Sequence, residues 1–301
     1  FLFFKNFPIS YFFRVFSFFL FIELIFILFP IPYHIVVNHD FYFAFNSANL
    51  FGLTGDKNIA AASLVFKLPF LFGYFFSVTN RYLKFIILLI SFLAYFAIFT
   101  ISARASFISL FVVIISLFIY LIVNKRSVFV YIYSLSSLFL AIFFNYLFTS
   151  SDSKDFISRV SSIGVNEQSS NGRFELWRNA LDFISDNIFL GAGIGNWKIE
   201  SLPYWKDKLS DYTVPYHAHN DFLEIFAELG IFGFFSFALI FVYTFKNALS
   251  HILNKRPFAL FIMASFLTFF IDSFFNFPLE RPISMVCFIS AYYIINSKTL
   301  Y

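Results

Sequence analysis

The sequence has a single cysteine, Cys287, among 301 residues, so a disulfide within the chain is excluded. Its cysteine and histidines form no cluster with the spacing of metal ligands, so we expect neither a metal nor a cofactor. Charged residues are also scarce, at 13%, whereas hydrophobic residues make up 60% and phenylalanine alone contributes 54 residues. A water-soluble core cannot absorb this many apolar side chains. The composition therefore predicts an integral membrane protein.

Eight apolar stretches are long enough to cross a bilayer core of about 30 Å as helices of about 20 residues. They lie near residues 10–30, 59–78, 82–101, 105–123, 128–148, 229–245, 257–275 and 282–297. The sequence thus predicts an all-α fold, a polytopic transmembrane helix bundle with about eight spans. The chain begins with Phe1 rather than methionine, so we expect further helices upstream.

The basic residues indicate the orientation, because lysine and arginine favour the cytoplasmic side of a membrane. With both termini cytoplasmic, that side carries no aspartate or glutamate, and its basic residues are Lys5, Arg14, Arg81, Lys84, Lys125, Arg126, Lys246, Lys255, Arg256 and Lys298. We expect three regions: N-terminal helices over 1–148, a long outer loop over 149–228 and C-terminal helices over 229–301. Because topology explains the net charge of +4, no nucleic-acid partner is expected.

The long outer loop contains an amphipathic pattern. Hydrophobic residues recur at helical spacing at Phe174, Trp177, Leu181, Ile184 and Ile188. This pattern predicts a helix over 173–189 that rests on the membrane or on the bundle. Arg173 lies in its first turn, where the helix dipole disfavours a cation, and no acidic residue follows at helical spacing. It either binds an external anion or is simply solvated.

Glycines follow this helix in the stretch GAGIGNW, residues 191–197. The G-x-G-x-x-G pattern of phosphate-binding loops fails at Asn196, and no βαβ unit surrounds the stretch. We therefore expect a turn that ends the helix.

The stretch YHAHNDFLEIFAELGIFG, residues 216–233, predicts an amphipathic helix that leads into a span. At a helix N-terminus His219 would stay neutral, able to accept a proton beside a natural phosphate position. The alternative is an interfacial histidine that only forms hydrogen bonds. Gly230 and Gly233 would let the helix bend or a neighbour pack closely.

The residues HNDFLEIFAELGIFG resemble the signature of the O-antigen ligase and polymerase superfamily: histidine, a small amide, nine residues, glycine, two residues and glycine. The preceding stretch GRFELWRNALDFISDNIFLGAGIGNW is similar to the arginine-containing loop helix and glycine turn of that family, with Arg173 as the motif arginine. TISARASFISL resembles its Ser-x-Arg, which points to Arg104. The serine register departs from the family pattern, and members usually have more spans.

Members of this superfamily join a glycan carried on undecaprenyl diphosphate to an acceptor hydroxyl at the periplasmic face of the bacterial inner membrane. The resemblance implies a metal-independent glycosyltransferase whose partners are this donor, a lipid or glycan acceptor and the bilayer. It implies that Arg104 and Arg173 hold the diphosphate, while His219 positions or deprotonates the acceptor. Further substrate contacts are expected at Asn220, Asp221, Arg281 and His217, although a rigid interfacial turn also explains Arg281.

Other functions remain open. An O-antigen polymerase of the Wzy type or a protein O-oligosaccharyltransferase would use the same donor, and the residues do not identify the acceptor. A small-anion transporter is another alternative. Such a protein should have inverted sequence repeats and a substrate site at the midplane of the bilayer, and the sequence shows no internal repeat. A non-catalytic scaffold subunit is a further possibility.

Two charged residues lie within the predicted spans. An ionised side chain at mid-membrane costs roughly 2.5–3.5 kcal/mol. Since Glu23 and Lys67 fall at similar depths in the first two spans, we expect them to face each other or to line a polar cavity.

Overall fold

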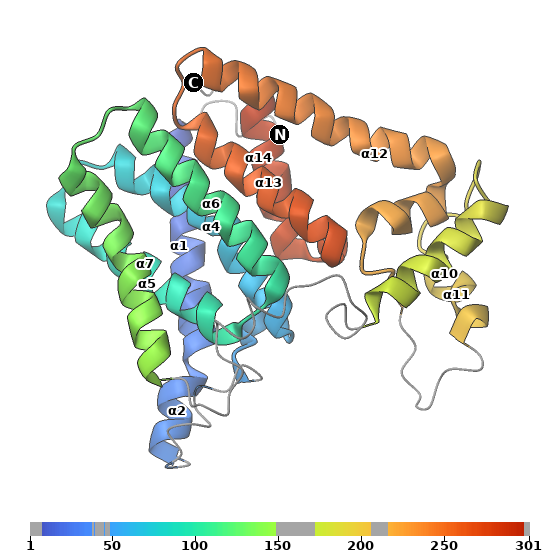
Figure 1. The fold of residues 1–301 in the computed structure, drawn as a ribbon, viewed down its shortest axis with the longest axis horizontal. Helices are drawn as coiled ribbons and strands as arrows, with labels where there is room; N and C mark the ends of the chain where they lie inside the picture. The colour runs from blue at the N-terminus through green and yellow to red at the C-terminus, as the bar shows by residue number, and fades with distance from the viewer. Residues whose placement is uncertain are drawn as a thin grey trace.

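The computed structural model describes residues 8–37, 39, 45, 49–148, 172–205 and 216–297. The described residues form helices and no strands (Figure 1). This confirms the predicted all-α class.

Each of the eight predicted spans overlaps an apolar helix of the described part, although α12 (Asp221–Leu253) is much longer than the span predicted over 229–245. Six helices of this part are long and apolar enough to cross a membrane: α1 (Ile9–Leu28) continued by α2 (Pro30–Val37), α4 (Lys57–Ser77), α5 (Arg81–Ile101), α6 (Arg104–Val123), α7 (Val128–Phe148) and α12. Two shorter apolar helices follow, α13 (Ala259–Phe275) and α14 (Pro282–Asn296). The protein is therefore a multi-pass membrane protein.

Helix α4 lies at the centre of the bundle, where it packs against α1, α5, α6 and α13. Its small and aromatic residues are almost all buried. Near Pro69, where the helix loses a backbone donor, Ser265 of α13 donates a hydrogen bond to the carbonyl of Phe66 at 2.7 Å. Such side-chain donors satisfy backbone groups that a proline disturbs within a membrane.

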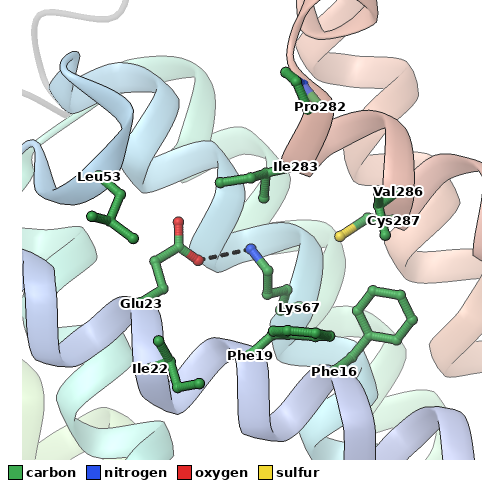
Figure 2. A pocket seen from close by; sticks show the side chains of 10 residues that line it. All are labelled: Phe16, Phe19, Ile22, Glu23, Leu53, Lys67, Pro282, Ile283, Val286 and Cys287. Atoms are coloured by element: carbon green, nitrogen blue, oxygen red, sulfur yellow. Dashed lines mark hydrogen bonds and ion pairs between the residues drawn. The ribbon is translucent and has the colours of Figure 1, made fainter.

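Glu23 of α1 and Lys67 of α4 form an ion pair inside the bundle, which confirms that they face each other (Figure 2). The Lys67 Nζ lies 2.7 Å from Glu23 Oε2, and both side chains are nearly buried. Lys67 also donates to the Ser63 carbonyl at 3.0 Å and to the Ser63 hydroxyl. The ammonium group thus has a full set of acceptors, as a charge in an apolar environment requires.

Removing one partner of this ion pair should destabilise the bundle. Lys67→Met would leave the Glu23 carboxylate buried without its cation, at a cost of about 3–5 kcal/mol. We expect a lower Tm in detergent for this variant. The double variant Glu23→Leu/Lys67→Met should recover most of the loss, because it removes both charges. A double variant as unstable as the single one would show that the charges are not the cause.

Several helices begin or end at one end of the bundle, here called the site end. Helices α4, α6 and α14 begin there, and α13 ends there. The carboxylate of Asp56 caps α4 by accepting the N–H groups of Asn58 and Ile59 at 2.8 and 3.1 Å. Only Ser102 and Ala103 separate α5 from α6, with Ser102 in the left-handed conformation, and Arg104 is the first residue of α6.

Beside the bundle lies a loop unit built from α10 (Arg173–Asp186), α11 (Trp197–Glu200) and the first turns of α12 (Figure 1). Its small core includes Ala180, Phe183, Ile184, Trp197 and Ala227. The amphipathic helix is confirmed, although it ends three residues earlier than predicted.

The predicted buried face of α10 is wrong in part. Leu181 is 52% exposed and Ile188 40% exposed, whereas Leu176, Ala180 and Phe183 are buried beside Ile184. Both sets fit helical spacing. The side that carries the small Ala180 faces the core because it lets the backbone of α10 lie close to its neighbours.

Candidate functional site

Helix α12 is broken near its start. Gly230 has φ 64° and ψ −164°, so the helix bends there, and Figure 1 shows its first turns folding back beneath the long part. The bend takes the Ala227 and Glu228 carbonyls out of the helical pattern. They accept hydrogen bonds from Ala192 N at 2.8 Å and Gly193 N at 2.7 Å. In return, Ile231 N donates to the Ile188 carbonyl at 2.8 Å.

The glycine turn after α10 is therefore hydrogen-bonded to the backbone of α12 where that helix bends. This confirms a turn at 191–197 and a bend at Gly230. The N–H groups of Ala192 and Gly193 face helix carbonyls, which leaves them no role in holding a phosphate.

Glycine is required where the two backbones meet. A Cβ at Gly191 would lie 2.6 Å from the Ala227 carbonyl oxygen, and a Cβ at Gly230 would collide with the Phe189 carbonyl. We expect Gly230→Ala to destabilise the loop unit by about 2–3 kcal/mol, measured by thermal unfolding. Gly195→Ala is the matched control, because Gly195 also has a positive φ, of 75°, but no atom within 4 Å of its Cβ position. Equal losses in the two variants would rule out the close backbone approach as the cause.

Four segments meet in a cavity of about 90 Å³ at the site end. They are the start of α4, the start of α10, the residues before α12, and the stretch that joins α13 to α14. The lining residues include Arg173, His219 and Arg281 together with Asp56, Asp272, Asn276 and Phe277. Two arginines and a histidine expected from the sequence thus share one pocket, although they are far apart along the chain.

Arg173 reaches from the first turn of α10 to the end of α13. Its guanidinium donates a hydrogen bond to Asn276 Oδ1 at 3.2 Å, and the Asn276 amide donates in turn to Asp272. Burial lowers the pKa of Arg173, the negative charge of Asp272 raises it, and the positive charge of Arg104 lowers it. The guanidinium is therefore held in place by α13 and feels a second arginine.

Arg104 does not line the cavity. It opens α6 near enough to Arg173 for its charge to affect the pKa of that residue. The structure therefore gives Arg104 an electrostatic influence on the pocket, and its direct contact with substrate stays a prediction.

His219 is half-buried in the cavity wall and has a left-handed backbone, with φ 50°. Its Nδ1 atom is buried and has no hydrogen-bond partner among the described residues. Burial lowers its pKa to about 4, with further lowering by the charges of Arg173 and His217. The imidazole is thus neutral at pH 7, and His219 is one of the residues that line the pocket. Burial is the largest cause of this lowered pKa, whereas the sequence analysis expected the N-terminus of a helix to keep His219 neutral.

Phe277 supports three of these side chains. The His217 ring stacks on it with centroids 4.2 Å apart, the His219 ring meets it edge-on at 5.0 Å, and the Arg281 guanidinium lies 4.4 Å from its centroid. The Nε of Arg281 is buried with no partner in the described part of the chain. Arg281 therefore belongs to the pocket, where its N–H groups can meet a ligand.

His217 lies behind the pocket between two carboxylates. Its Nδ1 is 3.0 Å from Glu224 and its Nε2 is 3.4 Å from Glu280. Burial alone would lower its pKa, but the hydrogen bond and charge of Glu224 raise it overall, with help from Glu280. These three residues are the one group in the described part with ligand atoms within 4.8 Å that a metal ion could use. A metal ion at this group would compete with the proton, whose binding the raised pKa of His217 favours.

Asn220 and Asp221 have structural contacts of their own and do not line the cavity. Asn220 caps α12 by accepting from Phe222 N at 3.0 Å and Leu223 N at 3.1 Å. Asp221 accepts from Leu279 N at 3.3 Å, so it ties α12 to the turn before α14. Their expected contact with substrate stays a prediction.

The pocket residues that sequence reasoning missed include Asp56, Asp272, Asn276 and Phe277. Two of them left a signal. Asp272 is an acidic residue at the end of an apolar run, where a carboxylate needs a partner. Asp56 directly precedes a span and is a typical helix cap. Asn276 and Phe277 carry no such pattern.

The low pKa of His219 predicts an unusual pH profile. If neutral His219 is needed, kcat/KM should stay high down to about pH 5 and fall with a midpoint near 4. Stability linked to His219 should decline as pH falls from about 6.5 toward 4, because the unfolded state binds the proton first. An activity loss centred near pH 6.5 would contradict a buried, neutral histidine.

A comparison with protein families identifies the family of the chain. The sequence model of the family described as O-antigen ligase matches residues 88–238, half of the chain. The matched region contains Arg104, Arg173, His219 and Gly230. No curated protein is significantly similar to the chain. Family membership supports a membrane glycosyltransferase-like function with glycan and lipid substrates. The chain, a multi-pass helical membrane protein, belongs to the O-antigen ligase family.

Proposed function

We propose that the protein transfers a glycan from undecaprenyl diphosphate to an acceptor hydroxyl at the outer face of the bacterial inner membrane. The observation that carries this proposal is the pocket in which a neutral histidine with an unpartnered nitrogen lies beside two arginines. A diphosphate leaving group needs positive charge, and an attacking hydroxyl needs a base.

Arg173 and Arg281 would hold the diphosphate. A guanidinium binds phosphate oxygens through two parallel N–H groups, and it stays charged despite partial burial. Asn276 and Phe277 hold the two side chains in place before substrate arrives. Arg104 adds positive potential from the start of α6. No step requires a metal in this scheme, because the arginines neutralise the developing charge.

His219 would accept the acceptor proton on its neutral imidazole. The acceptor oxygen then forms a bond to the anomeric carbon, while the bond from that carbon to the diphosphate oxygen breaks. The products are the glycosylated acceptor, undecaprenyl diphosphate and a protonated His219, which releases its proton to solvent. Attack opposite the leaving group inverts the anomeric centre.

The proposed orientation follows from the charge pattern. The site end faces the periplasm, the loop region 149–228 lies outside, and both termini are cytoplasmic. The basic residues between α4 and α5, α6 and α7, and α12 and α13 lie at the opposite end of the bundle.

A transfer assay in nanodiscs would test the function. Purified protein receives a lipid-linked glycan donor and one of three acceptors: lipid A core, a second lipid-linked glycan, or protein. We expect a glycosylated product and released undecaprenyl diphosphate with one acceptor, unchanged by a metal chelator. A parallel flux assay in proteoliposomes addresses the transporter alternative. Anion flux without transfer to any acceptor would overturn the proposal.

A further inference from the structure

A second cavity, of about 300 Å³, lies on the side of the bundle between α1, α4 and α14 (Figure 2). Its walls are apolar apart from the Glu23–Lys67 ion pair. The cavity opens toward lipid, since Phe19 is 49% exposed and Val286 54% exposed at its rim. A hydrocarbon chain can therefore enter it sideways from the bilayer.

This apolar cavity adjoins the site cavity along two helices. At the start of α14, Arg281 and Ser284 line the site cavity, whereas Pro282 and Val286 line the apolar one. On α4, Ile59 lines the first and Lys67 the second, about 12 Å deeper along the helix axis. A molecule with a charged head in the site cavity can therefore extend along α14 and α4 toward this apolar cavity.

We propose that the apolar cavity binds the isoprene units of the donor that lie nearest to its diphosphate. This inference rests on the proposed function. A cavity of about 150 Å³ holds one benzene, so 300 Å³ accommodates about two five-carbon units. The remaining units would stay in the bilayer.

The position of the cavity favours a polyprenyl chain over phospholipid. In a polyprenyl diphosphate the hydrocarbon begins at the phosphate oxygen, without an intervening glycerol. Val286 is only about 6 Å along α14 from Pro282, which follows Arg281 directly. The first isoprene unit can therefore reach the cavity while the diphosphate contacts the arginine.

Filling the cavity should change the preference for donor chains. Val286→Trp places an indole at its rim, and Ile289→Trp, one turn further along α14 and 38% exposed, is the matched control. The assay compares three donors with the same glycan diphosphate. The diphosphate is attached to a chain of eleven isoprene units, to a chain of two isoprene units, or to a methyl group. For Val286→Trp we expect KM to rise roughly fivefold or more with both prenyl donors and to stay unchanged with the methyl donor. Equal effects on all three donors, or none, would overturn the inference.

A binding measurement separates this inference from the proposed function. An undecaprenyl diphosphate analogue with a diazirine in its first isoprene unit is photolysed with the protein in nanodiscs. We expect crosslinks at Phe16, Phe19 or Val286, removed by excess undecaprenyl diphosphate but not by phosphatidylglycerol. Such crosslinks without any glycan transfer would contradict the proposed function but support the proposed binding of the prenyl chain. Crosslinks elsewhere, or equal competition by phosphatidylglycerol, would overturn the binding site even if transfer is observed.

Discussion

His219→Ala is expected to lower kcat for glycan transfer by about 100- to 10,000-fold, the range for losing a general base. The half-buried imidazole is neutral and lines the pocket, so it can take the acceptor proton. Its replacement removes that acceptor without breaking a hydrogen bond of the described fold at its Nδ1 atom. Transfer is measured with the lipid-linked donor in nanodiscs.

The control for this variant is His251→Ala, which alters a half-buried histidine at the other end of α12. It should keep full transfer. Both variants should insert into the membrane and elute as wild type does on size exclusion. Undiminished transfer by His219→Ala would exclude this residue from the mechanism.

Arg173→Ala is expected to lower kcat by about 100- to 1,000-fold, comparable to removing a donor that stabilises transition-state charge. The guanidinium contacts Asn276 and lines the pocket, so its loss leaves the departing diphosphate with less positive charge. Arg173→Lys should have intermediate activity, because lysine keeps the charge but lacks the planar pair of N–H groups.

The matched control is Arg178→Ala, which removes an exposed arginine from the same helix. It should leave kcat near the wild-type value. If Arg173→Ala lost stability while its kcat stayed normal, Arg173 would be structural, as a scaffold function predicts.

The spans were predictable because long apolar runs have one solution in a bilayer, a helix whose backbone groups bond to each other. The Glu23–Lys67 pair could also be predicted. An unpaired charge within the bilayer is costly, and these two opposite charges lie at similar depths in the predicted spans. The buried face of α10 was harder, because two overlapping sets of residues fit helical spacing and the choice depended on what packs against the helix.

The site residues could be predicted from the sequence only where a reactive or charged side chain was expected to contact substrate. His219, Arg173 and Arg281 carry functional groups that the proposed reaction needs, so they were expected, and they meet in one pocket. Phe277 and Asn276 were missed because their role arises from position alone. They follow a helix end whose location beside α10 and the start of α12 is a property of the assembled bundle.

The contact between the glycine turn and the break in α12 has a consequence for chimaeric proteins. The three hydrogen bonds between residues 188–193 and 227–231 involve only main-chain atoms, so relatives can exchange neighbouring side chains freely there. Gly191 and Gly230 cannot be exchanged for other residues, since each leaves room for the opposing chain. Grafting the loop from a relative to change acceptor choice should therefore carry both glycine stretches together, with junctions before Gly172 and after Gly233.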